Sequence, residues 1–474
     1  MIARIVVAGT SSGAGKTTVA CGLIGALRAR GLRVQGFKVG PDYIDPSYHA
    51  LASGRPGRNL DAFLSGPELI APLVRHGSRG ADIAVIEGVM GLFDGASGRG
   101  ELASTAHVAK LLDAPVVLVV DGSAMARSAA AIVHGFATFD PELRIAGLIF
   151  NRVGSEHHEA LLREAVAPLG IPVLGALRRD ERVVAPERHL GLVPAGEREQ
   201  RTRVALDTLA GAVARYVDVP AIKRLARAAA GGDAGSGGAA WSPEPSAAAL
   251  RSAVAADRPA AEESPAAGAR IAIARGPAFS FHYEENLELL AAAGAELAAF
   301  DPLCDERLPA DCGALILAGG FPEVFGAELS ANASLRAEVA AFVAAGRPVL
   351  AECGGLLYLC DELDGHEMCG AIGARATMTG RLSLGYRAAT AMTATPWLRA
   401  GERVRGHEFH YSQLQQTGTA GPAAWTLSAR GTTRPEGVAA GGLQASYLHV
   451  HWAAHPHVAL RFARAARDAH PAAA

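Results

Sequence analysis

The stretch "IVVAGTSSGAGKTTVACGL", residues 5–23, predicts the kind of fold that the first half of the chain adopts. A β-branched apolar run leads into a glycine-rich loop, and a helical pattern follows. This strand–loop–helix order is the context that a P-loop requires. Five residues separate Gly9 from Gly15, where the usual spacing is four. A glycine-rich turn with a chance Gly-Lys-Thr is therefore the competing interpretation.

The residues of this loop suit phosphate chemistry. Backbone N–H groups around Gly13 and Gly15 would surround phosphate oxygens at the positive end of the following helix. Lys16 would reach the outer phosphates, and the Thr17 hydroxyl would bind Mg²⁺. Thr18 begins the expected helix. We therefore predict an ATP site with Mg²⁺ as its cofactor.

Both halves of the chain alternate short apolar runs with helical patterns, which predicts an α/β fold with parallel sheets covered by helices. The strands expected in the first half are residues 2–8, 34–39, 83–86, 116–120 and 145–149. In the second half we expect strands from residue 270, at 315–317 and at 349–351, and a helix over 335–345.

The chain has 474 residues, which is too long for one ordinary core and predicts at least two domains. Residues 226–268 are rich in Ala, Gly, Ser and Pro and predict a flexible linker, with a helix around 247–256 as the alternative. The expected domains are therefore 1–225 and 269–474.

The composition excludes several classes of function. The net charge of −2, from 45 basic and 47 acidic side chains, gives no reason to expect a nucleic-acid or membrane partner. The six cysteines form no CxxC pair, which argues against a zinc site or a disulfide framework. No apolar segment is long enough to cross a bilayer or to act as a signal sequence, so we expect a cytoplasmic protein.

Polar residues follow the second expected strand in "FKVGPDYIDP". Lys38 ends the strand, and Asp42 and Asp45 follow in a Gly-Pro turn. Ligands of open parallel sheets bind at the carboxyl ends of strands. These three side chains should therefore face the same crevice as the P-loop. Alternatively, the two aspartates serve only the turn.

Two further strands end in polar residues. "IAVIEGVMGLFDG" places Glu87 at a strand end, where a carboxylate beside a P-loop would hold Mg²⁺ directly or through water. Asp94 follows in the glycine-rich turn. "GLIFNRVG" places Asn151 after another strand, where its amide would read adenine or simply form a turn.

The second half carries a different chemical signal in "VLAECGGLLYL". Cys353 lies where a strand turns sharply into a helix, which exposes a nucleophile and lowers a thiol pKa. The backbone N–H groups of Gly319 and Gly320, after another strand, would stabilise an oxyanion. His449 is a candidate base and His451 its rival. A buried structural cysteine is the alternative.

An ATP site and an amide-hydrolysing cysteine on one chain indicate amide synthesis, in which ATP activates a carboxylate and ammonia from L-glutamine displaces phosphate. The sequence resembles the cobyrinate or hydrogenobyrinate a,c-diamide synthase family of corrin-ring biosynthesis, over nearly the whole chain except the linker. The stretches that carry the resemblance are "FKVGPDYIDPSYH", "GRPGRNLD", "IEGVMGLFDG", "FSFHYEENLELL", "LAGGFPE", "LAECGGLLYL", "SLGYR", "GHEFHYS" and "SYLHVHW".

The resemblance implies an N-terminal domain like dethiobiotin synthetase and a C-terminal class I glutamine amidotransferase-like domain. It implies ATP, L-glutamine and a corrin carboxylate as substrates in cobalamin biosynthesis. By the same resemblance Cys353 is the glutaminase nucleophile and His449 the residue that activates it. The positions that match the oxyanion loop, the nucleotide and Mg²⁺ site and the acidic carboxylate-activating site are Gly319, Gly320, Lys16, Thr17, Glu87, Asp42, Asp45 and Asp94.

One position departs from the common class I pattern. Class I glutamine amidotransferases usually carry Glu two residues after the catalytic histidine, and this chain has His451 at that position. The third member of the triad is therefore absent or supplied from elsewhere, and Glu408 is one candidate.

Several alternatives to this function stay open. The substrate could be another tetrapyrrole, such as nickel-sirohydrochlorin, or other corrin carboxylates. The alternative from a different functional class is a partner-binding P-loop ATPase with an inactive amidotransferase domain. A homodimer is the expected assembly.

Overall fold

The computed structural model describes residues 2–179, 199–230, 238–244, 268–418 and 421–470. The chain divides into two compact units, Met1–Trp241 and Ser242–Ala474. Within the described ranges, no helix is long and apolar enough to span a bilayer.

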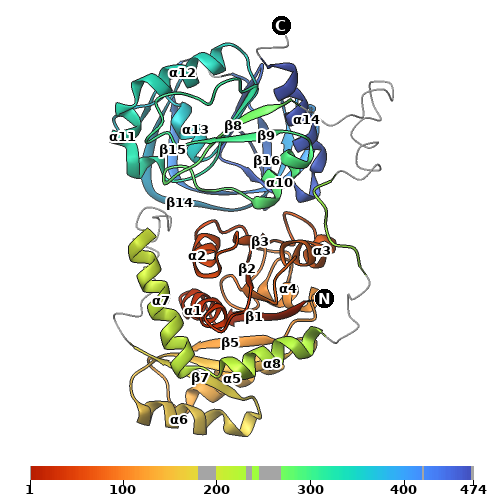
Figure 1. Cartoon of the computed structure of the whole chain (residues 1–474), viewed down its shortest axis with the longest axis vertical. Helices are drawn as coiled ribbons and strands as arrows, with labels where there is room; N and C mark the ends of the chain where they lie inside the picture. Colours follow the sequence, from red (N-terminus) through yellow and green to blue (C-terminus); the bar gives the residue numbers. More distant parts are fainter. Residues whose placement is uncertain (1, 180–198, 231–237, 245–267, 419–420, 471–474) are drawn as a thin grey trace. The chain divides into compact units, whose positions relative to one another are not determined.

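The first unit is built on a seven-stranded sheet in the order β3-β2-β4-β1-β5-β6-β7 (Figure 1), and all neighbouring strands run parallel. The carboxyl ends of β1, β2 and β4 therefore share one edge. The strands are β1 (Ala3–Gly9), β2 (Val34–Val39), β3 (Arg58–Leu60), β4 (Ile83–Glu87), β5 (Val116–Asp121), β6 (Ile145–Val153) and β7 (Val173–Arg178).

Helices connect these strands and cover the sheet. Ile5 and Val7 of β1 share one buried core with side chains of α1, α7 and α8. Gly22 lets α7 approach α1, because a Cβ there would lie 2.5 Å from the Val213 side chain. The helices of this unit are α1 (Lys16–Arg28), α2 (Ile44–Ser53), α3 (Pro67–Gly77), α4 (Thr105–Leu111), α5 (Ser128–Thr138), α6 (Glu156–Val166), η1 (Ala167–Leu169), α7 (Glu199–Tyr216) and α8 (Val219–Ala230).

The five strands expected in this half are present, because buried parallel strands are continuous apolar runs that the sequence displays directly. The short strand β3 and the strand β7 were not expected. The expected start of the linker at residue 226 falls inside α8, which ends at Ala230 and buries Ile222 and Ala226. Trp241 also packs against this unit, with its ring 4.9 Å from that of His76. The alternative helix at 247–256 lies outside the described residues.

The second unit contains a six-stranded sheet in the order β18-β19-β11-β10-β8-β9, in which only β18 runs antiparallel to its neighbour. Its strands are β8 (Arg270–Ala274), β9 (Glu296–Phe300), β10 (Ala314–Leu317), β11 (Val349–Glu352), β18 (Val438–Ala440) and β19 (Leu443–Ser446). The helices are α10 (Glu284–Ala292), η5 (Pro322–Phe325), α11 (Gly326–Ala331), α12 (Ala333–Ala344), α13 (Gly354–Leu359), η6 (Trp452–Ala454) and α14 (Pro456–Asp468).

A second, mostly antiparallel sheet of seven strands completes this unit. Its long strands β14 and β15 were not expected, because many of their side chains are exposed and few are large and apolar. The short strand β20 joins the edge of this sheet and pairs His449 with His407 of β15. The strands are β12 (Glu362–Leu363), β13 (His366–Glu367), β14 (Ala374–Ala391), β15 (Arg403–Gln416), β16 (Trp425–Ala429), β17 (Thr432–Glu436) and β20 (His449–Val450).

Candidate active site

The loop between β1 and α1 has the backbone of a phosphate-binding loop. Gly13 and Gly15 have φ values of 77° and 100°, a region that glycine adopts without strain. Gly15 also has no room for a side chain, because a Cβ would lie 1.9 Å from Nδ2 of Asn151. Lys16 and Thr17 then open α1, with Thr18 half-buried behind them. This arrangement confirms the expected strand–loop–helix order.

Two side chains brace the loop. The Lys16 ammonium donates a hydrogen bond of 3.0 Å to the carbonyl of Ser11, so it lies across the loop. The amide of Asn151 donates to the carbonyl of Ala14 at 3.0 Å. Asn151 lies within β6 and is 7% exposed, so the interpretation as a turn residue is wrong. Its amide contacts the P-loop from β6, which is separated from β1 by β5 in the sheet.

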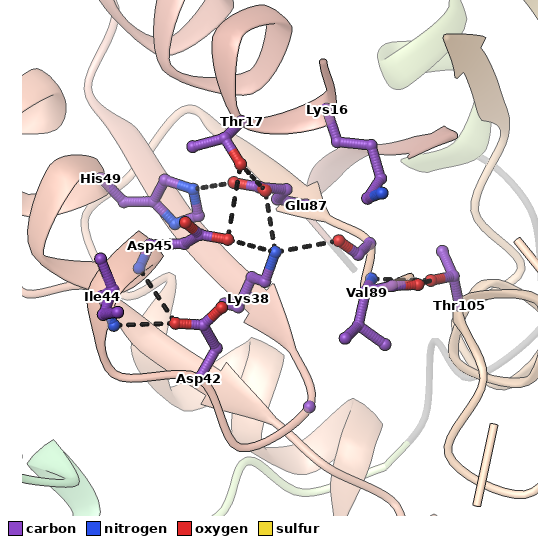
Figure 2. Close-up of polar contacts among 12 residues, drawn as sticks. Lys16, Thr17, Lys38, Asp42, Ile44, Asp45, His49, Glu87, Val89 and Thr105 are labelled. Carbon is purple, nitrogen blue, oxygen red and sulfur yellow. Dashed lines mark hydrogen bonds and ion pairs between the residues drawn. The ribbon is translucent and has the colours of Figure 1, made fainter. Parts of the chain in front are cut away.

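A buried cluster of charges lies beside the loop (Figure 2). Lys38, at the end of β2, is fully buried. Its ammonium lies 2.5 Å from a carboxylate oxygen of Asp45 and 2.8 Å from one of Glu87. It also donates to the Gly88 carbonyl at 3.0 Å. Lys38 and Asp45, which follow one another in the predicted segment, are therefore in contact, and Glu87 at the end of β4 joins them.

Burial and the neighbouring charges shift the pKa values of Lys38 and Glu87 in opposite directions. Burial alone lowers the pKa of Lys38, but the carboxylates of Asp45 and Glu87 outweigh it and raise that pKa. Burial likewise raises the pKa of Glu87, but Lys38 and His49 hold it well below its usual range. Lys38 and Glu87 therefore stay charged at neutral pH, because each compensates the other.

The oxygen atoms around Lys38 fit Mg²⁺. The Thr17 hydroxyl donates to Glu87 at 2.6 Å and lies 3.5 Å from Asp45, so one hydroxyl and two carboxylates converge (Figure 2). Mg²⁺ prefers such hard oxygen ligands and usually takes others from phosphates and water. In the described part of the chain, no three His, Cys, Asp or Glu side chains gather to hold a metal by themselves. The donor set thus suits an ion that arrives with a nucleotide.

Asp42 and Asp94 bind backbone in this structure. Asp42 accepts hydrogen bonds from the N–H groups of Ile44 and Asp45 at 2.8 and 3.2 Å, the turn role weighed as the alternative (Figure 2). Asp94 accepts from the Gly91 N–H at 2.9 Å. Both aspartates therefore shape the loops that surround the Lys38 cluster.

His49 also belongs to this site, although it was not predicted from the sequence. His49 lies on α2, and its Nε2 is 2.7 Å from a carboxylate oxygen of Glu87; both side chains are fully buried. It follows Asp45 by four residues, and positions four apart share one face of a helix. That spacing within "IDPSYH" is the signal that could have identified it.

The second unit places Cys353 at a strained turn between β11 and α13. Its φ of 48° lies in the left-handed region, which non-glycine residues rarely adopt. The two following glycines permit the turn: a Cβ on Gly354 would lie 2.8 Å from the Gly320 nitrogen, and one on Gly355 would lie 2.1 Å from the Leu317 carbonyl oxygen. The expected sharp strand-to-helix turn is therefore present, beside the Gly320 backbone.

The thiol itself is buried. Cys353 is 5% exposed, and its Sγ lies 3.6 Å from the Phe409 carbonyl oxygen. Burial raises the pKa of Cys353, and the charges of Glu323 and Glu352 raise it further, against the opposing effect of the Gly354 N–H. The expectation of a lowered thiol pKa is wrong for this structure, because burial outweighs the hydrogen bond from the Gly354 N–H.

His449 lies against the predicted oxyanion loop. A Cβ on Gly319 would lie 2.5 Å from Cε1 of His449, so the glycine leaves room for the ring. On its other side, the His449 ring stacks on that of His407 with centroids 5.1 Å apart. The structure thus brings together Gly319 and His449, while Gly320 adjoins the turn of Cys353.

The two other residues considered for the glutaminase site have different partners. The Glu408 carboxylate is fully buried and binds the guanidinium groups of Arg387 and Arg434. His451 lies beyond the end of β20, and its Nε2 is 3.4 Å from a carboxylate oxygen of Glu285 on α10. His451 therefore pairs with a carboxylate of α10, and Glu408 pairs with two arginines.

A P-loop unit with convergent oxygen ligands and a second unit with a cysteine turn, a glycine pair and a histidine define a glutamine-dependent carbon–nitrogen ligase. Comparisons with known proteins support this assignment to a class of ligase. Residues 5–193 match the CobQ/CobB/MinD/ParA nucleotide binding domain, and residues 270–457 match the CobB/CobQ-like glutamine amidotransferase domain.

Curated relatives match over nearly their full lengths. Hydrogenobyrinate a,c-diamide synthase of Streptomyces coelicolor is 54% identical over 98% of both chains. The protein of that name from Mycobacterium tuberculosis H37Rv is 49% identical over 97% of both chains. Cobyrinate a,c-diamide synthase of Syntrophotalea carbinolica is 44% identical over 97% of both chains. The chain belongs to the cobyrinate/hydrogenobyrinate a,c-diamide synthase family.

Proposed function

We propose that this chain converts the a and c acetate carboxylates of a corrin ring to amides, with ATP and L-glutamine as co-substrates. The observation that carries the proposal is the 54% identity, over 98% of both chains, to a relative named for this reaction on hydrogenobyrinate. A relative named for cobyrinate is 44% identical. This difference favours the metal-free ring as the substrate.

The first unit would activate the carboxylate. A substrate acetate near Lys38, Asp42, Asp45 and Asp94 attacks the γ-phosphate of ATP, which yields an acyl phosphate and ADP. Lys16 offsets the charge that develops on the phosphate oxygens. Thr17, Asp45 and Glu87 would hold Mg²⁺, which supplies further positive charge to the phosphates when bound.

The second unit would supply ammonia. His449 takes the proton of the Cys353 thiol, and the sulfur attacks the side-chain amide of glutamine. The backbone N–H groups of Gly319 and Gly320 stabilise the oxyanion. Ammonia leaves with the proton returned by His449, and water then hydrolyses the glutamyl thioester to glutamate. Ammonia displaces phosphate from the acyl phosphate, and the cycle repeats on the second carboxylate.

Mass spectrometry of the product tests this function. The purified chain receives Mg²⁺, ATP and glutamine together with either hydrogenobyrinate or cobyrinate. We expect two carboxylates of hydrogenobyrinate to become amides, each with a mass decrease of about one unit, since an OH group is replaced by NH₂. Conversion of cobyrinate alone would reverse the assignment of the ring. No amide on either ring, with ATP still hydrolysed, would contradict the proposal.

A further inference from the structure

The residue before the nucleophile, Glu352, connects the cysteine turn to the histidine strand. It ends β11, with 13% of its side chain exposed. One carboxylate oxygen accepts a hydrogen bond of 3.3 Å from the Val450 N–H, and the other lies 3.7 Å from Nδ1 of His449. A single carboxylate therefore contacts both residues of β20, directly beside Cys353.

Strand pairing fixes this arrangement. Glu352 of β11 is the register partner of Ser446 of β19, and the Cys353 N–H donates to the Ser446 carbonyl at 2.7 Å. The chain then reaches His449 within three residues. Pairing of β11 with β19 therefore places Glu352 and Cys353 beside Ser446, three residues before His449, and the Glu352 carboxylate reaches the histidine ring.

The usual place for a triad carboxylate is filled differently here. His451 stands two residues after His449 and contacts Glu285, and Glu408 binds two arginines. We propose that Glu352 is the positioning residue for His449, so that the third member of the triad precedes the nucleophile in the chain. This inference rests on the proposed roles of Cys353 and His449.

The proposed role is to orient the imidazole and to stabilise its charged form. Glu352 accepts the Nδ1–H of His449, which presents Nε2 to the Cys353 thiol. The thiol proton moves to Nε2, the imidazolium keeps its Nδ1–H bond to the ionised carboxylate, and the same proton leaves with ammonia. A distance of 3.7 Å is long for a hydrogen bond, and such catalytic contacts commonly shorten only when substrate binds.

The direction in which turnover changes when the Glu352 charge is removed distinguishes action through His449 from direct action on the Cys353 thiol. Acting directly on the thiol, the Glu352 charge disfavours the Cys353 thiolate. Removing that charge would then favour the nucleophile and increase turnover. If Glu352 acts through His449, removing the charge destabilises the imidazolium and decreases turnover.

The test begins with Glu352→Gln, which keeps the side-chain shape and an oxygen to accept the Val450 N–H. We expect the glutamine-dependent kcat to fall at least about ten-fold, with KM for glutamine within about three-fold of wild type. The ammonium-dependent reaction should keep its rate. The matched control is Glu402→Gln, which breaks another carboxylate–histidine contact in the same unit, to His457 of α14. It should retain the glutamine-dependent kcat.

A double-mutant cycle with His449→Ala identifies the path of the effect. If Glu352 acts through His449, adding Glu352→Gln to His449→Ala should change the remaining rate by less than about two-fold. An unchanged kcat in Glu352→Gln, an additive loss in the double variant, or a parallel loss of the ammonium reaction would each overturn the inference. Full glutamine-dependent activity in His449→Ala would instead overturn the proposed base, and this inference with it.

Discussion

Lys38 and Glu87 are register partners on the neighbouring strands β2 and β4, and their charged groups lie 2.8 Å apart with no exposure to solvent. Strand pairing therefore delivers an ammonium and a carboxylate to the same point at the edge of the sheet. The ammonium also binds Asp45, so it offsets two buried negative charges next to the P-loop. The same buried ion pairs that stabilise the first unit therefore lie at the candidate nucleotide site.

Replacing Lys38 with methionine should destabilise the first unit. It leaves Asp45 and Glu87 buried without their cation, and breaking a buried ion pair in this way typically costs about 3–5 kcal/mol. Urea unfolding measures the free energy of unfolding. The control is Lys110→Met, because Lys110 pairs with Asp140 near the surface, where such pairs contribute about 0–1 kcal/mol. Equal losses in the two variants would contradict the buried-pair argument.

The two units should separate by their nitrogen source. Cys353→Ser should abolish glutamine-dependent amidation and keep the reaction driven by high ammonium, because only the release of ammonia needs the thiol. Lys16→Ala should lose amidation with either source, since activation of the carboxylate precedes both. Rates of amide formation under the two conditions provide the measurement. Ammonium-driven turnover at the wild-type rate in Lys16→Ala would remove the P-loop from the mechanism.

Gly319→Ala should impair the glutaminase reaction alone. The added methyl would lie 2.5 Å from Cε1 of His449, so the ring must move, and small misplacements of catalytic groups cost up to about 100-fold in rate. Steady-state rates with glutamine and with ammonium measure the effect. Gly380→Ala is the matched control in the same unit, because a Cβ there has nothing within 4 Å. A normal glutamine rate in Gly319→Ala would show that the ring has room after all.

Alkylation should reveal the raised pKa of Cys353. Burial keeps this thiol protonated at neutral pH, and the thiolate is the form that reacts. Without glutamine, iodoacetamide should therefore modify the exposed Cys304 before Cys353, and raising the pH should accelerate the reaction of Cys353. Peptide mass spectrometry over time follows both sites. Preferential modification of Cys353 at neutral pH would show that the thiol is already ionised.

Glu436 should make the second unit less stable as the pH rises. Burial raises its pKa to about 7, against the hydrogen bonds from Ser446 and the Tyr447 N–H. The folded state therefore holds a proton that the unfolded state releases near pH 4.3. The stabilisation from this proton is complete below about pH 4 and is lost as the pH rises through about 7, with a total on the order of 3 kcal/mol.

Glu436→Gln should remove this part of the pH dependence, because the amide stays neutral throughout and can bond both neighbours. Unfolding is measured in urea at about pH 5.5 and pH 8 by tryptophan fluorescence, since Trp397, Trp425 and Trp452 lie in this unit. The loss of stability between the two pH values should be smaller in the variant. An equal loss in both proteins would exclude Glu436 as its source.

Some elements of the structure were predictable from the sequence and others were not. The P-loop and the Cys353 turn each lie within about a dozen consecutive residues, so their geometry follows from local chain chemistry. The long strands β14 and β15 are half-exposed, and the pattern of their side chains did not distinguish them. His49 and Glu352 were missed as site residues, because the partner of each, Glu87 or His449, lies far from it in the chain.

The sequence alone therefore predicted the α/β class, the strand–loop–helix order of the P-loop, and the sharp turn at Cys353. These features depend on local periodicity and on glycine positions, which the chain displays directly. The tertiary structure alone shows which carboxylate meets which basic side chain: Lys38 with Glu87, His451 with Glu285, and Glu352 with His449. Such contacts depend on strand register and helix packing, because these bring together residues that are up to 166 positions apart in the chain.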